Sequence, residues 1–214
     1  MSEARSAVET EERGIDRGVA RRQAFLKAAR AVFLEFGFEA ASVNEIVRRA
    51  GGSLATLYAQ FGNKEGLFQA VTGEQQERFM RELLPHCAED LPLEQGLQVM
   101  GEQLLTAVLT KDNLAFYRIV VGEGRKFPEL MQRYISGSAE RTRNAVSNYI
   151  AMRAKREGLE IPNAERTASY FFEVVRGRHV YRAMADATYT LSPEEVTQDV
   201  RQAVQFFLHG AFGR

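Results

Sequence analysis

A short stretch in the first third of the chain carries polar side chains of the kinds that contact nucleic acid. Thr56, Tyr58 and Gln60 lie at alternate positions, and Lys64 follows four residues later. A hydroxyl or carboxamide can hydrogen-bond a base edge in the DNA major groove, while a phenol or ammonium group can bind a phosphate. Side chains of these types could hydrogen-bond DNA, and their role depends on the elements that position them.

Capping residues divide the region around these side chains into two short helices. Ser42 and Glu45 have the spacing of a capping box, in which the Ser42 hydroxyl accepts from the Glu45 amide and the Glu45 side chain reaches back. Gly51-Gly52 breaks this helix, and Ser53 can cap a second one. Two short helices joined by a tight turn, ending near Phe61, are the arrangement of a helix-turn-helix.

Longer helices must brace this motif on both sides. From Arg21 to Phe36 the apolar residues recur at helical spacing, with Phe25, Ala28, Ala29, Val32, Phe33 and Phe36 on one face. Gly37 follows where a left-handed helix end would need glycine. Asn63 is expected to cap a long helix after the motif, and Pro85 is expected to lie beyond the end of that helix.

The rest of the chain also has helical patterns, and no useful stretch alternates apolar and polar residues as a strand would. Pro, Gly and Ser punctuation predicts helices at about 91–110, 113–124, 128–157, 163–187 and 193–210. We therefore expect an all-α fold. Its expected domains are a flexible N-terminal arm (1–20), a three-helix helix-turn-helix domain (21–66) and a larger helical body (67–214).

Composition and charge restrict the class of protein. The chain has 214 residues, 45% of them hydrophobic, and one cysteine, which excludes an intramolecular disulfide framework and a Cys-rich zinc site. No apolar segment is long enough for a membrane span and no secretory signal is visible, so we expect a soluble cytoplasmic protein. Although the net charge is zero, residues 17–64 hold eight basic and three acidic side chains, which predicts a local anion-binding face.

The spaced positions of the motif resemble a known family. The agreeing segments occur in order and are Phe33-x-x-x-Gly37-Phe38, Ser42-Val43-x-x-Ile46, Ala50-Gly51, Ser53-x-x-Thr56-Leu57-Tyr58-x-x-Phe61 and Lys64-Glu65-x-Leu67. Over residues 21–71 the chain resembles the N-terminal domain of the TetR family of bacterial transcriptional regulators. A later stretch, from Phe116-Tyr117-Arg118 to Phe127-Pro128-Glu129-Leu130, resembles the ligand-domain pattern of one TetR subgroup. Gly52 stands where the family usually has Val or Met, and this departure predicts a looser turn.

The resemblance implies which residues contact DNA. The expected contacts are Arg21, Arg22, Ser42, Asn44, Ser53, Leu54, Ala55, Thr56, Tyr58, Gln60 and Lys64. Ser42 and Ser53 are caps first, and Leu57 and Phe61 are expected in the core. Because residues 54–60 hold no Arg or Lys, we predict that Gln60 reads adenine while Leu54, Ala55 and the Thr56 methyl contact thymine methyl groups.

By the same resemblance, residues 67–214 should bind an unidentified small-molecule effector and form a homodimer on a palindromic operator. The two C-terminal helices are the expected interface, through the stripes Ala168, Phe171, Phe172, Val175 and Val196, Val200, Ala203, Val204, Phe207, Leu208, unless these are buried within one subunit. A mostly apolar pocket is expected between the middle helices, lined by Met100, Leu104, Phe116, Tyr117, Arg118, Tyr134, Tyr149, Phe172, Arg176 and His179. Arg118 and Arg176 could bind an acidic ligand group or pair with Glu123 and Glu173.

Two other classes of protein were weighed against this interpretation. An enzyme is disfavoured because His86, His179 and His209 lie far apart and no dinucleotide, Walker or nucleophile-elbow motif is present. We expect no catalytic residue, cofactor or metal. A helical adaptor that binds only protein, with the helix-turn-helix used as scaffold, would explain the apolar terminal helices. It would leave the basic segment and the motif series unexplained, so a ligand-responsive repressor is preferred.

Overall fold

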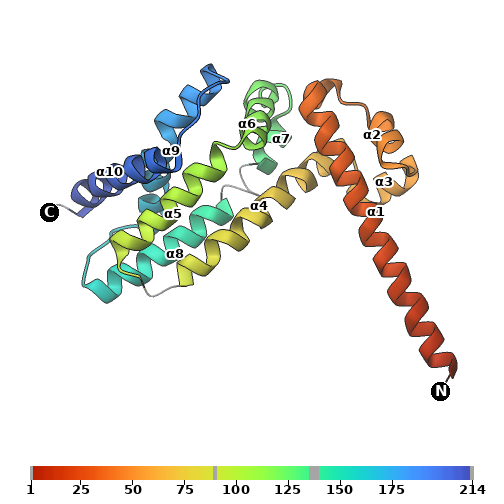
Figure 1. Cartoon of the computed structure of the whole chain (residues 1–214), viewed down its shortest axis with the longest axis horizontal. Coiled ribbons are helices and arrows are strands. Elements are labelled where there is room, and N and C mark those ends of the chain that lie inside the picture. Colours follow the sequence, from red (N-terminus) through yellow and green to blue (C-terminus); the bar gives the residue numbers. More distant parts are fainter. Residues whose placement is uncertain (1, 89–90, 135–139, 213–214) are drawn as a thin grey trace.

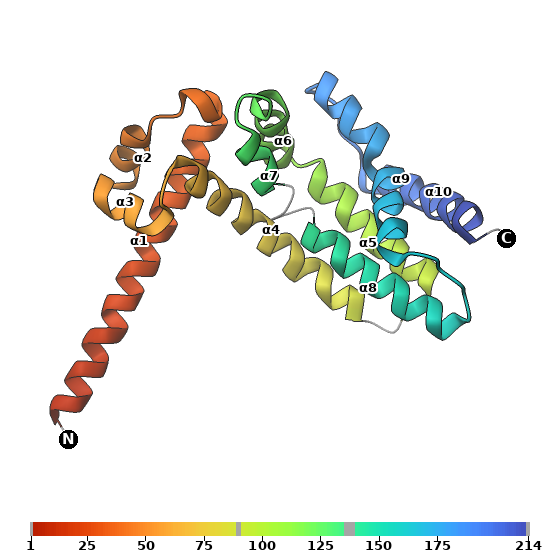
Figure 2. The same ribbon diagram turned by 180° about the vertical axis from the view of Figure 1, so that it is seen from behind.

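The computed structural model describes residues 2–88, 91–134 and 140–212, and every regular element in these residues is a helix (Figures 1 and 2). The helices are α1 (Ser2–Ala40), α2 (Val43–Ala50), α3 (Leu54–Phe61), α4 (Lys64–Ala88), α5 (Leu93–Val108), α6 (Lys111–Glu123), α7 (Pro128–Tyr134), α8 (Glu140–Glu157), α9 (Ala164–Ala185) and α10 (Pro193–Phe212). The expected all-α fold is confirmed. In the described part of the chain, no helix is long and apolar enough to cross a bilayer.

The helices enclose two hydrophobic cores. The first joins α1, α2, α3 and the start of α4, and its fully buried side chains include Phe25, Phe33, Ile46 and Leu57. It also takes in Phe116 from α6, and α1 contacts α6, so the N-terminal helices pack directly against the body. The second core lies among α5, α8, α9 and α10. Figure 1 shows α4 running from the N-terminal helices into the body.

Helix α1 differs from its expected form at both ends. It begins at Ser2, so the backbone of residues 2–20, the expected N-terminal arm, is helical. Its apolar face is buried as predicted except for Phe36, which is 47% exposed. The Phe36 ring instead lies beneath the Arg49 guanidinium, 5.8 Å away. At Gly37 the backbone leaves the helical conformation with φ 77°, which is the break that the glycine predicts.

Two further boundaries differ from the sequence prediction. The helix expected over 128–157 is formed as α7 and α8, and its residues 135–139 lie outside the described ones. Helix α4 continues past Pro85 to Ala88, so its expected end before this proline is wrong. The proline removes one N–H donor, and the helix ends within one turn after it.

The apolar stripes of α9 and α10 complete the core of one subunit. Ala168, Phe171, Phe172, Val175, Val196, Val200, Val204 and Phe207 are buried, and Ala203 and Leu208 pack against them. The Phe171 and Phe207 rings meet edge to face with centroids 5.4 Å apart. These stripes pack against α5, so their expected role as the dimer interface is wrong. A strongly apolar helix face can pack within its own subunit or against a second subunit. Here both stripes pack within the subunit, against α5.

Candidate DNA-binding surface and ligand cavity

The helix-turn-helix forms through the predicted caps. The Ser42 hydroxyl accepts from the Glu45 amide at 3.4 Å, and the Ser53 hydroxyl accepts from the Thr56 amide at 3.1 Å. Between them, Gly51 has a left-handed backbone (φ 69°) and its N–H donates to the Val47 carbonyl. The Glu45 carboxylate does not reach back as a capping box requires, because it accepts from Arg48 and Arg49.

Helix α3 turns one face into the core and the other to solvent. Leu57 and Phe61 are buried, as predicted. Leu54 is 38% and Tyr58 is 43% exposed, which is unusual for large apolar or aromatic side chains. Seven of the expected DNA contacts lie on the exposed surface of this region, namely Ser42, Asn44, Ser53, Leu54, Ala55, Thr56 and Tyr58. This surface is referred to below as the α3 face.

The four remaining expected DNA contacts are Arg21, Arg22, Gln60 and Lys64, and their side chains are turned toward the protein itself. Arg21 donates to the backbone carbonyls of Ala50 and Gly51. The guanidinium of Arg22 lies 4.6 Å from the centroid of the Phe61 ring. The side-chain oxygen of Gln60 is buried without a partner, so it does not face a base. The predicted reading of adenine by Gln60 therefore requires its carboxamide to turn outward.

Lys64 is also anchored within the protein. Its ammonium group donates to the Glu39 carbonyl at 2.8 Å and lies 4.9 Å from the centroid of the Phe38 ring. Partial burial lowers the pKa of Lys64 below its ordinary value, and the nearby carboxylates oppose this shift. The ammonium group can still offer further N–H donors to a phosphate, since it has three.

Sequence reasoning did not select Arg48 and Arg49 as site residues. They lie in the last turn of α2, next to the α3 face, and both donate to Glu45 at 2.7 Å. The side chain of Arg48 is 71% exposed, whereas Arg49 is held from two sides because it also pairs with Glu35. Hydrogen bonds from Arg48 and then Arg49 lower the pKa of Glu45 to about 2. An adjacent pair of arginines in the last turn of α2 was the signal that could have identified them.

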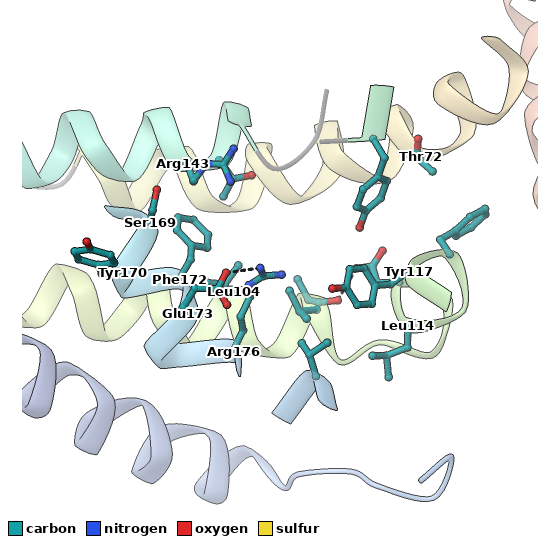
Figure 3. A pocket seen from close by; sticks show the side chains of 17 residues that line it. Thr72, Leu104, Leu114, Tyr117, Arg143, Ser169, Tyr170, Phe172, Glu173 and Arg176 are labelled. Atoms are coloured by element: carbon teal, nitrogen blue, oxygen red, sulfur yellow. Dashed lines mark hydrogen bonds and ion pairs between the residues drawn. The ribbon is translucent and has the colours of Figure 1, made fainter. Parts of the chain in front are cut away.

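A cavity of about 330 Å³ lies between the middle helices. Its wall is formed by α4, α5, α6, α7, α8 and α9, and Figure 3 shows side chains from several of these helices converging on it. Its lining residues include Leu104, Phe116, Tyr117, Tyr134, Phe172 and Arg176 from the sequence prediction. Polar residues that the prediction missed also line it, among them Thr72, Asn113, Arg143, Ser169 and Glu173. Single polar residues on different helices gave no sequence signal for a shared site.

Four residues that were expected in the cavity lie elsewhere. Met100 is buried in the body core. Arg118 donates to the Ala183 carbonyl rather than pairing with Glu123. The Tyr149 hydroxyl donates to the Leu91 carbonyl at 3.0 Å, and His179 is buried beside the connection between α9 and α10. Each of these polar groups has found a partner inside the subunit, which satisfies it without a ligand.

His179 belongs to a separate polar cluster. Its Nδ1 lies 2.7 Å from the Tyr189 hydroxyl, and its Nε2 lies 3.4 Å from Asp199 Oδ2. Burial, and then the charge of Arg178, lower the pKa of His179. No group of three or more metal-ligating side chains occurs in the residues that the structure describes.

The end of α6 connects the cavity to the helix-turn-helix domain. The Glu123 carboxylate accepts from the backbone amides of Phe38 and Glu39, at 2.9 and 2.7 Å. At the start of α6, Asp112 pairs with Arg30 of α1. The Phe116 ring of α6, which lines the cavity, also packs edge to face on Phe68 of α4, with centroids 5.6 Å apart. One helix therefore touches the cavity, α1 and α4.

Comparison with proteins of known sequence finds family matches in both halves of the chain. Residues 25–71 match the family model of bacterial regulatory proteins of the tetR family. The chain is 45% identical over 58 residues to the HTH-type transcriptional repressor ComR of Escherichia coli K12 and 40% identical over 53 residues to the A-factor receptor protein of Streptomyces griseus. These matches span 27% and 25% of this chain, and only 28% and 19% of the two relatives.

Solved structures are similar over most of the chain. The Flavonoid-responsive Regulator FrrA has a TM-score of 0.73 and 28% identity, covering 91% of this chain and 98% of that one. A TetR family transcriptional regulator from Pseudomonas syringae pv. tomato DC3000 has a TM-score of 0.65 and 26% identity, covering 87% and 94%. Residues 95–210, more than half of the chain, match the family model for the C-terminal domain of AefR-like transcriptional repressors. The chain therefore belongs to the TetR family of bacterial transcriptional regulators.

Proposed function

We propose that this protein is a repressor that binds a palindromic operator as a homodimer and is released from it by a small, mostly apolar ligand. The observation that carries this proposal is that one helix, α6, connects the cavity to the helix-turn-helix domain. Helix α6 lines the cavity and also holds the end of α1 through Glu123. A ligand that moves α6 would therefore change the position of the helix-turn-helix domain.

DNA contact is proposed for the α3 face. Its exposed Leu54, Ala55 and Thr56 suit the methyl groups and edges of bases in a major groove, and Tyr58 suits a phosphate. Arg48, exposed at the end of α2, adds a positive charge beside this face. Arg21 supports the turn through one terminal nitrogen, which donates to two turn carbonyls, and its other N–H groups are proposed to contact a phosphate.

Repression and release follow from a difference in the ligand's affinity for two conformations of the protein. A ligand that binds better to a form in which the two reading heads are badly spaced weakens operator binding, and typical couplings are about 1–3 kcal/mol. The likeness to a regulator named as flavonoid-responsive supports a flat aromatic molecule as one kind of effector. The Phe116, Tyr117, Tyr134 and Phe172 rings in the cavity wall suit the faces of such a molecule.

The test is a capture of sheared genomic DNA from the source organism by the purified protein, followed by sequencing. A Thr56→Ala/Tyr58→Ala double variant serves as the control, since both side chains are exposed and their removal should leave the fold intact. We expect one or a few intergenic palindromes to be enriched by the natural protein and lost with the variant.

Two further outcomes are informative. If the natural protein enriches DNA no better than the variant does, the capture is repeated with protein refolded free of any bound ligand. A trapped effector would itself release the DNA. A second failure would contradict the repressor and favour the adaptor that uses its helix-turn-helix as scaffold. Genes beside the enriched palindromes would narrow the chemistry of the effector.

A further inference from the structure

The wall of the cavity carries more positively than negatively charged side chains. Arg143 of α8 and Arg176 of α9 both line it, and Glu173 is the one carboxylate among the described lining residues. Figure 3 shows these residues on two different walls, with Arg176 extending toward the middle of the cavity. The remaining lining residues are apolar or neutral. A ligand in this cavity therefore meets one net positive charge.

The two arginines are incompletely paired. One terminal nitrogen of Arg176 donates to Glu173 at 2.6 Å, but its Nε is buried and has no hydrogen-bond partner. For Arg143, no hydrogen bond or ion pair is found within the described residues. A guanidinium has five N–H donors, so the one hydrogen bond to Glu173 leaves donors for a charged acceptor. The Nε atom itself has no exposed surface, but the Arg176 side chain is 32% exposed and lines the cavity, so its terminal nitrogens can donate to an oxygen anion there.

From these observations we infer that the effector is an amphipathic monoanion, with a flat apolar body and one carboxylate that binds Arg176. This rests on the proposed function, because it assigns a chemical class to the ligand of that same cavity. The apolar walls around Leu104, Leu114 and Phe172 would hold the body. Glu173 competes with the carboxylate for Arg176, so the natural affinity for the anion is lower than the site could reach.

A matched pair of probes tests the charge. The full chain, without DNA, is titrated with 2-naphthoate and with 2-naphthamide, which share a body and differ in charge. Because the protein has no tryptophan, naphthalene emission can be followed without an indole background. We expect naphthoate to bind about tenfold more tightly or better, as a hydrogen bond to a charged group would provide. Equal affinities, or no binding of either probe, would overturn the inference.

Variants locate the effect. Arg176→Gln should bring the two affinities close together, and Glu173→Gln should raise the affinity for naphthoate. Arg178→Gln is the matched control, because Arg178 lies on the same helix but pairs with Asp199 outside this cavity. A preference for naphthoate that persists in Arg176→Gln would also overturn the assignment. Since the titration contains no DNA, its failure is separate from a failure of operator capture.

Discussion

The turn between α2 and α3 is held from beneath by residues of α1. A Cβ atom at Gly52 would lie 2.5 Å from Cζ of Phe25, whose ring is fully buried. Arg21, one helical turn before Phe25, donates to the carbonyls of Ala50 and Gly51. The space that a larger residue at 52 would fill is thus taken by the Phe25 ring. The turn is closed rather than loosened, contrary to the expectation from Gly52.

Gly52→Ala should therefore destabilise the protein. Crowding the Phe25 ring is expected to cost about 1–3 kcal/mol of unfolding free energy, the usual penalty for overpacking. Urea denaturation followed by circular dichroism would measure it. Gly18→Ala is the control, since a Cβ there meets nothing within 4 Å and alanine favours a helix. A Gly52→Ala protein as stable as its parent would show that Phe25 does not close the turn.

The ion pairs of Glu45 make a pH prediction. Its pKa falls from the ordinary 4.5 to about 2 in the folded protein, chiefly through hydrogen bonds from Arg48 and Arg49. A lowered folded pKa gives stability that is complete above 4.5 and is lost as the pH falls toward 2. The stability difference between the natural protein and Glu45→Gln should therefore shrink across this window in urea titrations. A stability difference that stays the same between pH 4.5 and pH 2 would contradict the lowered pKa of Glu45.

Among the elements, α6 has the contacts needed to pass a signal. Its Glu123 accepts two amides just after Gly37, where α1 breaks, and Lys126 beyond its end pairs with Glu39. A Cβ at Gly37 would lie 3.0 Å from Glu123 Oε1, so the carboxylate lies tightly against this break. The end of α1 therefore follows any shift of the end of α6.

Replacing Glu123 with alanine should uncouple the cavity from DNA. The change leaves the amides of Phe38 and Glu39 without their acceptor. The Phe38 amide is partly buried, and its loss of a partner is expected to cost about 1–3 kcal/mol of stability. More specifically, the ratio of operator dissociation constants with and without a saturating effector should fall toward one, while the effector still binds. Gel-shift titrations measure that ratio, and Glu129→Ala is the control. An unchanged ratio in Glu123→Ala would assign the coupling to other contacts.

Local signals predicted the elements better than the site. Caps at Ser42, Ser53 and Asn63 act on neighbouring residues, so the sequence alone placed α2, α3 and the start of α4. The role of Arg21 depends on which helices meet, and no local pattern contains that information. The Glu173–Arg176 pair is different, because the two residues lie three apart on α9 and the sequence already offered this pairing as an alternative. The described residues of 128–157 form α7 and α8, and the sequence between these helices holds Ser136-Gly137-Ser138, a turn signal that the prediction of one helix left out.

In the whole molecule, the outer faces of α9 and α10 carry exposed aromatic side chains, whereas the apolar stripes on the inner faces are buried. Tyr181 is 78% and Phe206 is 70% exposed, and Tyr170 is also largely exposed. Large aromatic side chains on helices whose inner faces already fill the core are typical of a protein interface. We propose that these outer faces pair in the homodimer, with the same helices but a different surface from the sequence prediction.

A charge placed on this surface should separate the subunits. Tyr181→Glu/Phe206→Glu is expected to reduce the mass measured by light scattering from twice 24.1 kDa to 24.1 kDa, because two carboxylates cannot be buried against their symmetry mates without large desolvation. Val121→Glu, on α6 and 48% exposed, is the control for adding charge to an apolar surface position.

Operator binding should fail together with the dimer. Each reading head contacts only a few base pairs, and two heads joined at a spacing of about 34 Å, one helical turn of DNA, read both halves of a palindrome. The monomeric variant keeps its α3 face, so it should still bind a single half-site. Its affinity for the full operator should fall to this weak half-site affinity, because only one head is bound. A variant that is monomeric yet binds the full operator with undiminished affinity would contradict this two-headed recognition and leave one head sufficient.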